Sequence, residues 1–149
     1  MVLQADDTAL YEKFGIRWYD DAHTILLCEP PSNWTWDDAY TILKLMNGLC
    51  DTVEHGVYSV FYYRMTHASV LPKGNAVPHI RRLLNITHPN DELVIFVGAN
   101  TFARRMIDMA GRLYGFRALV SDFRFVDTLD AMKATVRQHK AQSNEREAS

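Results

Sequence analysis

Hydrophobic and polar residues recur at two different periods along the chain, and these periods predict where strands and helices lie. Residues 14–18 (FGIRW) alternate between apolar and other positions, which is typical of a half-buried strand. The apolar segment 24–29 (TILLCE) follows a short polar turn, so the two segments predict an antiparallel hairpin. Residues 57–63 (VYSVFYY), 93–97 (LVIFV) and 123–126 (FRFV) predict three further strands.

Four helices are predicted between and after these strands. The longest is expected over residues 36–54, where Thr35 and Asp38 have the spacing of a capping box. Its predicted buried face consists of Trp36, Tyr40, Leu43, Met46, Cys50 and Val53. A short helix is expected at 78–84, with Asn75 as its cap, followed by helices at 101–114 and 129–139.

The resulting order, β-β-α-β-α-β-α-β-α, predicts an α/β fold. Three successive strand–helix units imply parallel strands joined by right-handed crossovers, and the hairpin adds an antiparallel edge. We therefore expect a single mixed sheet of about five strands with helices on its faces. Residues 11–139 are expected to form one domain, preceded by a loose leader (1–10) and followed by a disordered tail (140–149).

The order of these elements, together with the stretches 93–98 (LVIFVG) and 123–129 (FRFVDTL), resembles the STAS-like domains. This family includes bacterial anti-sigma-factor antagonists and relatives that share the sheet with the lipid-binding SEC14 class. The resemblance covers about residues 14–139. It implies a STAS-like fold and a regulatory or protein-interaction role without catalysis. The antagonists carry an Asp-Ser phosphorylation motif in the loop that corresponds to 63–74 (YRMTHASVLPKG), but this chain has no Asp-Ser pair there, so we assign no phosphorylated residue.

Composition and charge narrow the classes of partner. Lysine and arginine number 16 against 18 acidic residues, a net charge of −2, so nothing predicts the basic surface of a nucleic-acid-binding protein. No apolar run approaches the length of a membrane span, and the first residues have no signal-peptide pattern. Cys28 and Cys50 are interpreted as buried free thiols. These features predict a cytoplasmic protein.

Catalytic chemistry is not indicated by residue spacing. The six histidines form no metal-binding pattern, and we interpret them as surface residues at the ends of helices and loops. No G-x-S-x-G motif is present, and Cys28 has no obvious activating neighbour. The sequence therefore predicts a protein that is not an enzyme and needs neither a metal nor a cofactor.

The most plausible binding surface lies after the central strands, because α/β folds place their sites at the carboxyl ends of parallel strands. It comprises the loop 64–78, the helix after it and the turn 98–101. The residues predicted to bind a partner or ligand are Arg64, Thr66, His67, Ser69, Lys73, Arg82, Asn100 and Thr101. We expect another protein as the partner. The alternatives are a small anionic or lipid ligand of the SEC14-like kind, and homodimer formation is left open.

Overall fold

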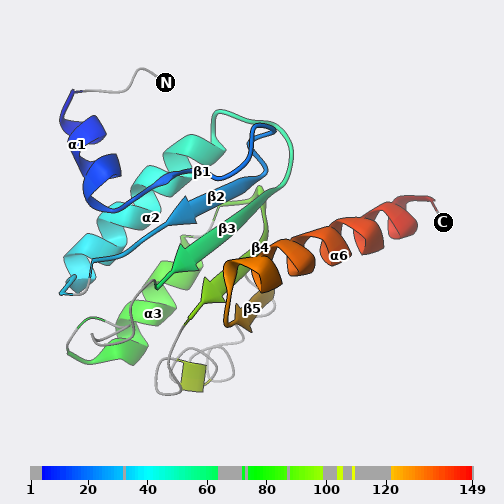
Figure 1. Ribbon diagram of the computed structural model, residues 1–149. Coiled ribbons are helices and arrows are strands. Elements are labelled where there is room, and N and C mark those ends of the chain that lie inside the picture. The colour runs from blue at the N-terminus through cyan, green and yellow to red at the C-terminus, as the bar shows by residue number, and fades with distance from the viewer. Residues whose placement is uncertain are drawn as a thin grey trace.

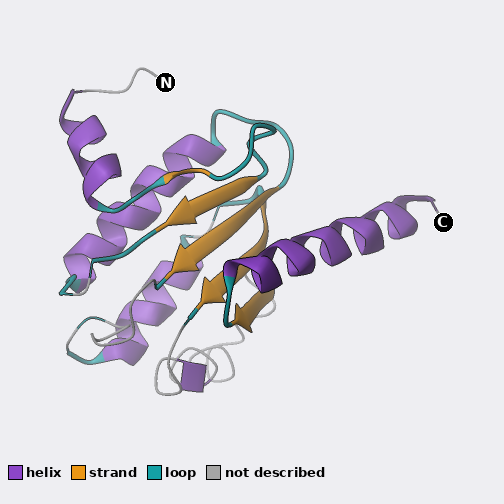
Figure 2. Ribbon diagram, viewed as in Figure 1, coloured by secondary structure: helices purple, strands orange, loops and turns teal. Residues whose placement is uncertain are grey.

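A five-stranded mixed sheet forms the centre of the protein in a computed structural model (Figures 1 and 2). The structure describes residues 5–31, 33–63, 72, 74–86, 88–98, 104, 105, 109 and 122–148. The strands are β1 (Arg17–Trp18), β2 (Ile25–Cys28), β3 (Val57–Tyr62), β4 (Asp91–Val97) and β5 (Asp122–Val126). The longer helices of the described residues are α1 (Ala5–Lys13), α2 (Trp36–Cys50), α3 (Ala76–Asn85) and α6 (Leu129–Ala148).

The strands lie side by side in sequence order, β1-β2-β3-β4-β5. β1 is antiparallel to β2, whereas β2, β3, β4 and β5 are parallel to one another. This arrangement confirms the predicted α/β fold, the mixed sheet and the antiparallel hairpin. Because all the parallel strands point the same way, their carboxyl ends share one edge of the sheet, where α2 and α3 begin (Figure 1).

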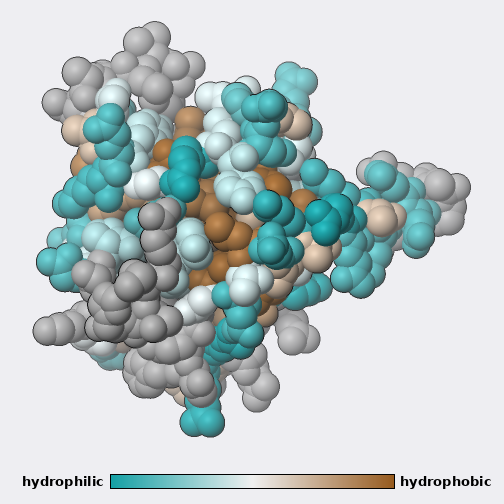
Figure 3. Space-filling view, viewed as in Figure 1, coloured by the Kyte–Doolittle hydropathy of each residue, from teal (hydrophilic) through white to brown (hydrophobic). Residues whose placement is uncertain are grey.

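Two hydrophobic cores lie on opposite faces of the sheet. α2 and α3 bury their apolar sides against one face, together with residues of β2 such as Leu26 and Cys28. α6 covers the other face through Met132 and Val136, which contact the core of Leu27, Val60 and Ile95. Apolar side chains in the middle of the front surface, beside α6, are visible in the space-filling view (Figure 3).

Both chain ends differ from the prediction. Within the expected loose leader the structure forms α1 from Ala5 onward, which places Leu10 and Tyr11 against the first core. α6 likewise continues through the expected disordered tail as far as Ala148. Its last residues include alanine, glutamine and glutamate, which favour a helix without needing apolar contacts.

The first strand is shorter than the alternating pattern predicts. The Phe14 N–H donates to the Leu10 carbonyl at 3.1 Å, so this residue ends α1 instead of starting a strand. Gly15 then takes a left-handed conformation (φ 57°), which reverses the chain into β1. Phe14 and Ile16 are nonetheless buried, as the alternation indicates.

The capping box of α2 is confirmed, and its predicted face is partly wrong. The Asp38 N–H donates to Thr35 Oγ1 at 3.1 Å, and the Thr35 N–H donates to Asp38 Oδ2 at 3.0 Å. The buried residues of α2 are Trp36, Ala39, Ile42, Leu45, Met46 and Cys50. Tyr40, Leu43 and Val53 are only half-buried, because α2 meets both the sheet and α3 and so buries a different stripe.

Candidate functional site

The structure brings the first residues of α2 and α3 together at the carboxyl edge of the sheet. The Trp36 and His79 rings stack with their centroids 4.8 Å apart and an interplanar angle of 13°. The Tyr40 hydroxyl lies 3.0 Å from His79 Nδ1, within hydrogen-bond distance. Further along, the Asn47 side-chain amide donates to the Ile86 carbonyl at 2.7 Å. α2 and α3 therefore run parallel and begin side by side.

Trp36 places a polar atom in this junction. The side chain is only 8% exposed, and its indole Nε1–H has no hydrogen-bond partner. The edge of the ring that carries Nε1 faces Gly74. If residue 74 had a Cβ atom, that atom would lie 3.7 Å from Trp36 Nε1. Gly74 has a φ of 112°, which favours glycine at this position.

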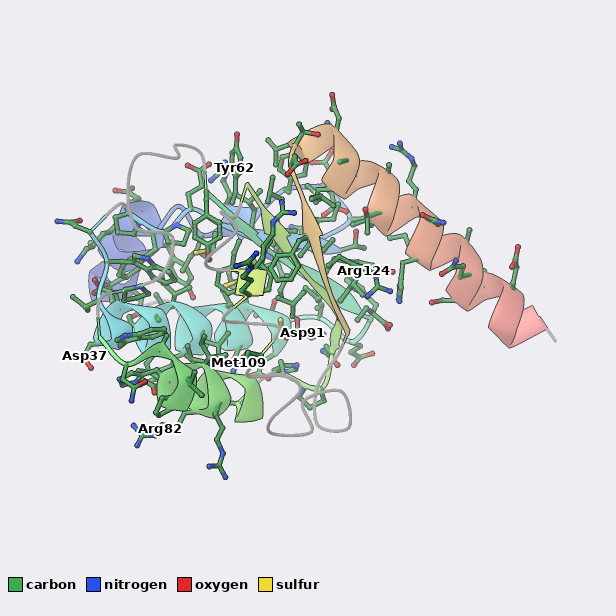
Figure 4. The ribbon with its side chains drawn as sticks, turned by 90° about the horizontal axis from the view of Figure 1, so that it is seen from below. Asp37, Tyr62, Arg82, Asp91, Met109 and Arg124 are labelled. Carbon is green, nitrogen blue, oxygen red and sulfur yellow. The ribbon has the colours of Figure 1, made fainter. Side chains whose placement is uncertain are left out.

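The exposed side of α3 presents a stripe of three residues spaced four apart. Pro78, Arg82 and Ile86 are all exposed, and Ile86, at 44%, is one of two large hydrophobic residues of the described chain that are exposed. Figure 4 shows the Arg82 side chain pointing outward from α3. The opposite side of α3 is anchored by Ala76 and Ile80, which are buried in the first core. We call Pro78, Arg82 and Ile86 the α3 stripe.

One of the eight predicted binding residues falls within the described chain. Arg82 lies on the exposed side of α3, as a contact residue should. The remaining seven lie outside the described residues: Arg64, Thr66, His67, Ser69, Lys73, Asn100 and Thr101. The predicted helix 101–114 also lies mostly outside them. Gly98, the first residue of the predicted turn, has a φ of 81°, and a side chain there would meet the Tyr63 carbonyl at 2.8 Å.

The interpretation of the histidines as plain surface residues is wrong for three of them. His79 is held between Trp36 and Tyr40. His88 Nε2 lies 2.6 Å from Asp51 Oδ1, and the Tyr58 hydroxyl lies 2.8 Å from His139 Nδ1. Each contact joins residues at least 37 positions apart, so no local pattern in the sequence could reveal it.

The half-buried carboxyl group of Asp91 lies beside the C-terminal end of α2, and sequence reasoning missed it as well (Figure 4). The Ser59 hydroxyl donates to Asp91 Oδ1 at 2.5 Å, and both residues lie on adjacent parallel strands. Burial raises the pKa of Asp91 from 3.8 to about 6, although the Ser59 hydrogen bond and nearby His88 act in the opposite direction. Nothing in the turn Pro89-Asn90-Asp91 distinguishes this aspartate from an exposed one.

The two cysteines are buried free thiols, as predicted. Burial raises the pKa of Cys50 to about 12, with Asp91 and Asp51 adding to the effect, and it raises that of Cys28 as well. Such thiols hold little thiolate, the reactive form, near neutral pH. Across the described residues, no group of three histidine, cysteine or acidic side chains could hold a metal ion.

A concave surface lies beside the edge strand β1. An open groove of about 620 Å³ runs between α1, β1 and the end of α2, and its walls are mostly apolar. Its lining residues include Tyr11, Ile16, Trp18 and Leu49. The Tyr11 hydroxyl is buried there without a hydrogen-bond partner.

Together these features define the protein as an α/β domain with a mixed five-stranded sheet and a helix junction at its carboxyl edge. Comparison of the chain with models of known protein families, with curated proteins and with solved structures finds no match. The STAS-like resemblance therefore stays a prediction, as do the protein partner and self-association. None of the helices in the described part of the chain is long and apolar enough to cross a membrane.

Proposed function

We propose that this protein is a non-enzymatic regulatory or protein-interaction module of STAS-like type, and that it contacts its partner through the α3 stripe. The observation that carries the proposal is the exposed stripe itself, in which an arginine lies between two apolar residues on a well-anchored helix. Arginine and apolar side chains that become buried together are typical of the residues that dominate protein–protein binding.

The position of the stripe also favours a binding role. α3 follows the central parallel strand β3, so it borders the edge of the sheet where folds of this kind place their sites. The helix is fixed to α2 near both ends, by the Tyr40–His79 and Asn47–Ile86 contacts. A rigid helix loses little conformational entropy when a partner binds, which improves affinity.

Affinity capture of partners from cells tests the proposal. Arg82→Glu reverses a charge in the middle of the stripe and is expected to reduce partner recovery at least about tenfold, as for an interface hot spot. Arg137→Glu makes the same change at an exposed position of α6 and serves as the matched control, with recovery unchanged. Equal recovery with both variants would place the partner elsewhere and refute the proposal.

The groove beside α1 favours a second candidate, a small-molecule or lipid-binding module of SEC14-like type. Its volume of about 620 Å³ is in the range of small-molecule sites, and its apolar walls suit an acyl chain. Titration with a fluorescent fatty acid should then give saturable binding that Leu49→Arg abolishes, since the arginine would fill the groove. No saturable signal with the unmodified chain would exclude this candidate.

A further inference from the structure

A buried hydrogen-bond donor without an acceptor is unusual in a folded protein, and Trp36 Nε1–H is such a donor. Buried polar groups nearly always have a partner, because leaving one unpaired costs free energy. Trp34 and Trp36 are equally buried, at 8% exposure, so burial alone does not distinguish them. What distinguishes Trp36 is that its Nε1 edge faces Gly74, directly before the start of α3.

The start of α3 supplies further donors at the same place. Asn75 occupies the N-cap position, but its side chain makes no capping hydrogen bond, and the first turn holds no acidic residue. The Ala76 and Val77 N–H groups have no acceptor among the described residues. The N–H groups of a first helical turn and the helix dipole together favour a negative charge at such an end.

The junction therefore gathers hydrogen-bond donors from two helices. If the Tyr40 hydroxyl donates to His79 Nδ1, the ring carries its proton on Nε2, which makes it another donor. A ligand that satisfies several neighbouring donors must offer several acceptor oxygens. A tetrahedral oxyanion does so, since each of its oxygens accepts hydrogen bonds in a different direction.

We propose that the junction of the α2 and α3 N-termini binds a phosphate-type oxyanion, with Trp36 Nε1–H and the first-turn N–H groups of α3 as its donors. The site lies next to the α3 stripe but does not depend on a protein partner. The first turn of α2 holds two acidic residues, Asp37 and Asp38, which limit its affinity by repulsion, and Asp37 is exposed there (Figure 4). The phosphate is either free or part of a monoester on another molecule, and both sources present the same oxygens.

Titration of the ¹⁵N-labelled full chain with inorganic phosphate tests the proposal. Sodium chloride keeps the ionic strength constant, and ¹H–¹⁵N spectra follow the indole signals of Trp18, Trp34 and Trp36. The expected result is a saturable shift of the Trp36 indole signal, with an affinity on the order of millimolar. A Trp36 signal that does not move, or that moves equally with chloride alone, would overturn the proposal.

Three variants sharpen the test. Trp36→Phe retains an aromatic ring against His79 and removes the N–H, so phosphate binding should weaken about tenfold or more. Trp34→Phe is the matched control and should bind as the unmodified chain does. Asp37→Asn should tighten binding a few-fold by removing a negative charge, an outcome that misfolding cannot produce. Equal weakening by both tryptophan variants would contradict the assignment of Nε1 as a donor.

Parallel titrations distinguish the sources of the oxyanion. Tighter binding of O-phosphoserine than of inorganic phosphate supports a monoester on a modified protein, and the reverse order supports free phosphate. Acetate binding as tightly as phosphate would overturn the assignment to a tetrahedral anion. The two proposals can fail separately. If partner capture depends on Arg82 but phosphate does not bind, the oxyanion site is refuted and the proposed function stands. If phosphate binds but partner capture does not depend on Arg82, the proposed function is refuted and the oxyanion site stands.

Discussion

The half-buried carboxyl group of Asp91 makes the stability of the protein depend on pH in an unusual direction. Its pKa rises from 3.8 to about 6 on folding, chiefly because burial disfavours the charged form. The folded state therefore binds this proton more tightly than the unfolded state does. Stability from this group is fully present below pH 3.8 and is lost as pH rises through about 6.

The size of the effect follows from the two pKa values. A change from 3.8 to about 6 corresponds to about 3 kcal/mol, at about 1.4 kcal/mol per pKa unit. Of this total, about 2 kcal/mol is expected to develop between roughly pH 4.5 and pH 7.5. Asp91→Asn retains an oxygen that can accept from the Ser59 hydroxyl but cannot ionise. The variant should thus gain about 2 kcal/mol relative to the unmodified chain over that interval.

Urea denaturation at the two pH values measures this difference. Groups distant from Asp91 titrate equally in both proteins. The change in the difference between their unfolding free energies therefore reports on Asp91 and on its interaction with His88. Asp21→Asn, at an exposed position, serves as the control and should give the same difference at both pH values. A difference for Asp91→Asn that does not change with pH would refute the argument, since the carboxyl group would then ionise in the fold as it does in the unfolded chain.

Two further predictions concern local features of the fold. Thr35→Ala removes one half of the capping box of α2, so urea denaturation should show a loss of about 1 kcal/mol, whereas Thr52→Ala, outside the helix, should cost less. Cys28 and Cys50 should resist iodoacetamide at pH 8 in the folded protein, because burial raises the pKa of both thiols, and mass spectrometry should detect modification of both once urea is added. Rapid alkylation without urea would contradict the buried assignment.

Features that depend on neighbours in the sequence could be predicted, and those that depend on distant partners could not. The capping box of Thr35 and Asp38 and the N-cap position of Asn75 were both foreseen, because each is set by residues within one helical turn. The strands followed from their apolar runs, and the sheet followed from the order of the elements. The buried stripe of α2 was misassigned, since it depends on where α3 packs.

In the candidate site, too, features set by nearby residues could be predicted and features set by distant residues could not. Arg82 could be predicted as exposed because it is a charged residue on a short amphipathic helix. The stacking of His79 on Trp36 could not, because 43 positions separate them and only the βαβ crossover brings the two helix starts together. Asp91 is similar, as its partner Ser59 lies 32 positions away on a neighbouring strand.

The central claim is that partners bind at the carboxyl edge of the sheet, on and beside α3. Hydrogen–deuterium exchange of the protein, alone and in complex with a captured partner, tests this most directly. The account predicts slower exchange on binding in α3 (Ala76–Asn85) and at the start of α2, with no change in the last turns of α6. Protection confined to α1 and β1, or to α6, would contradict it.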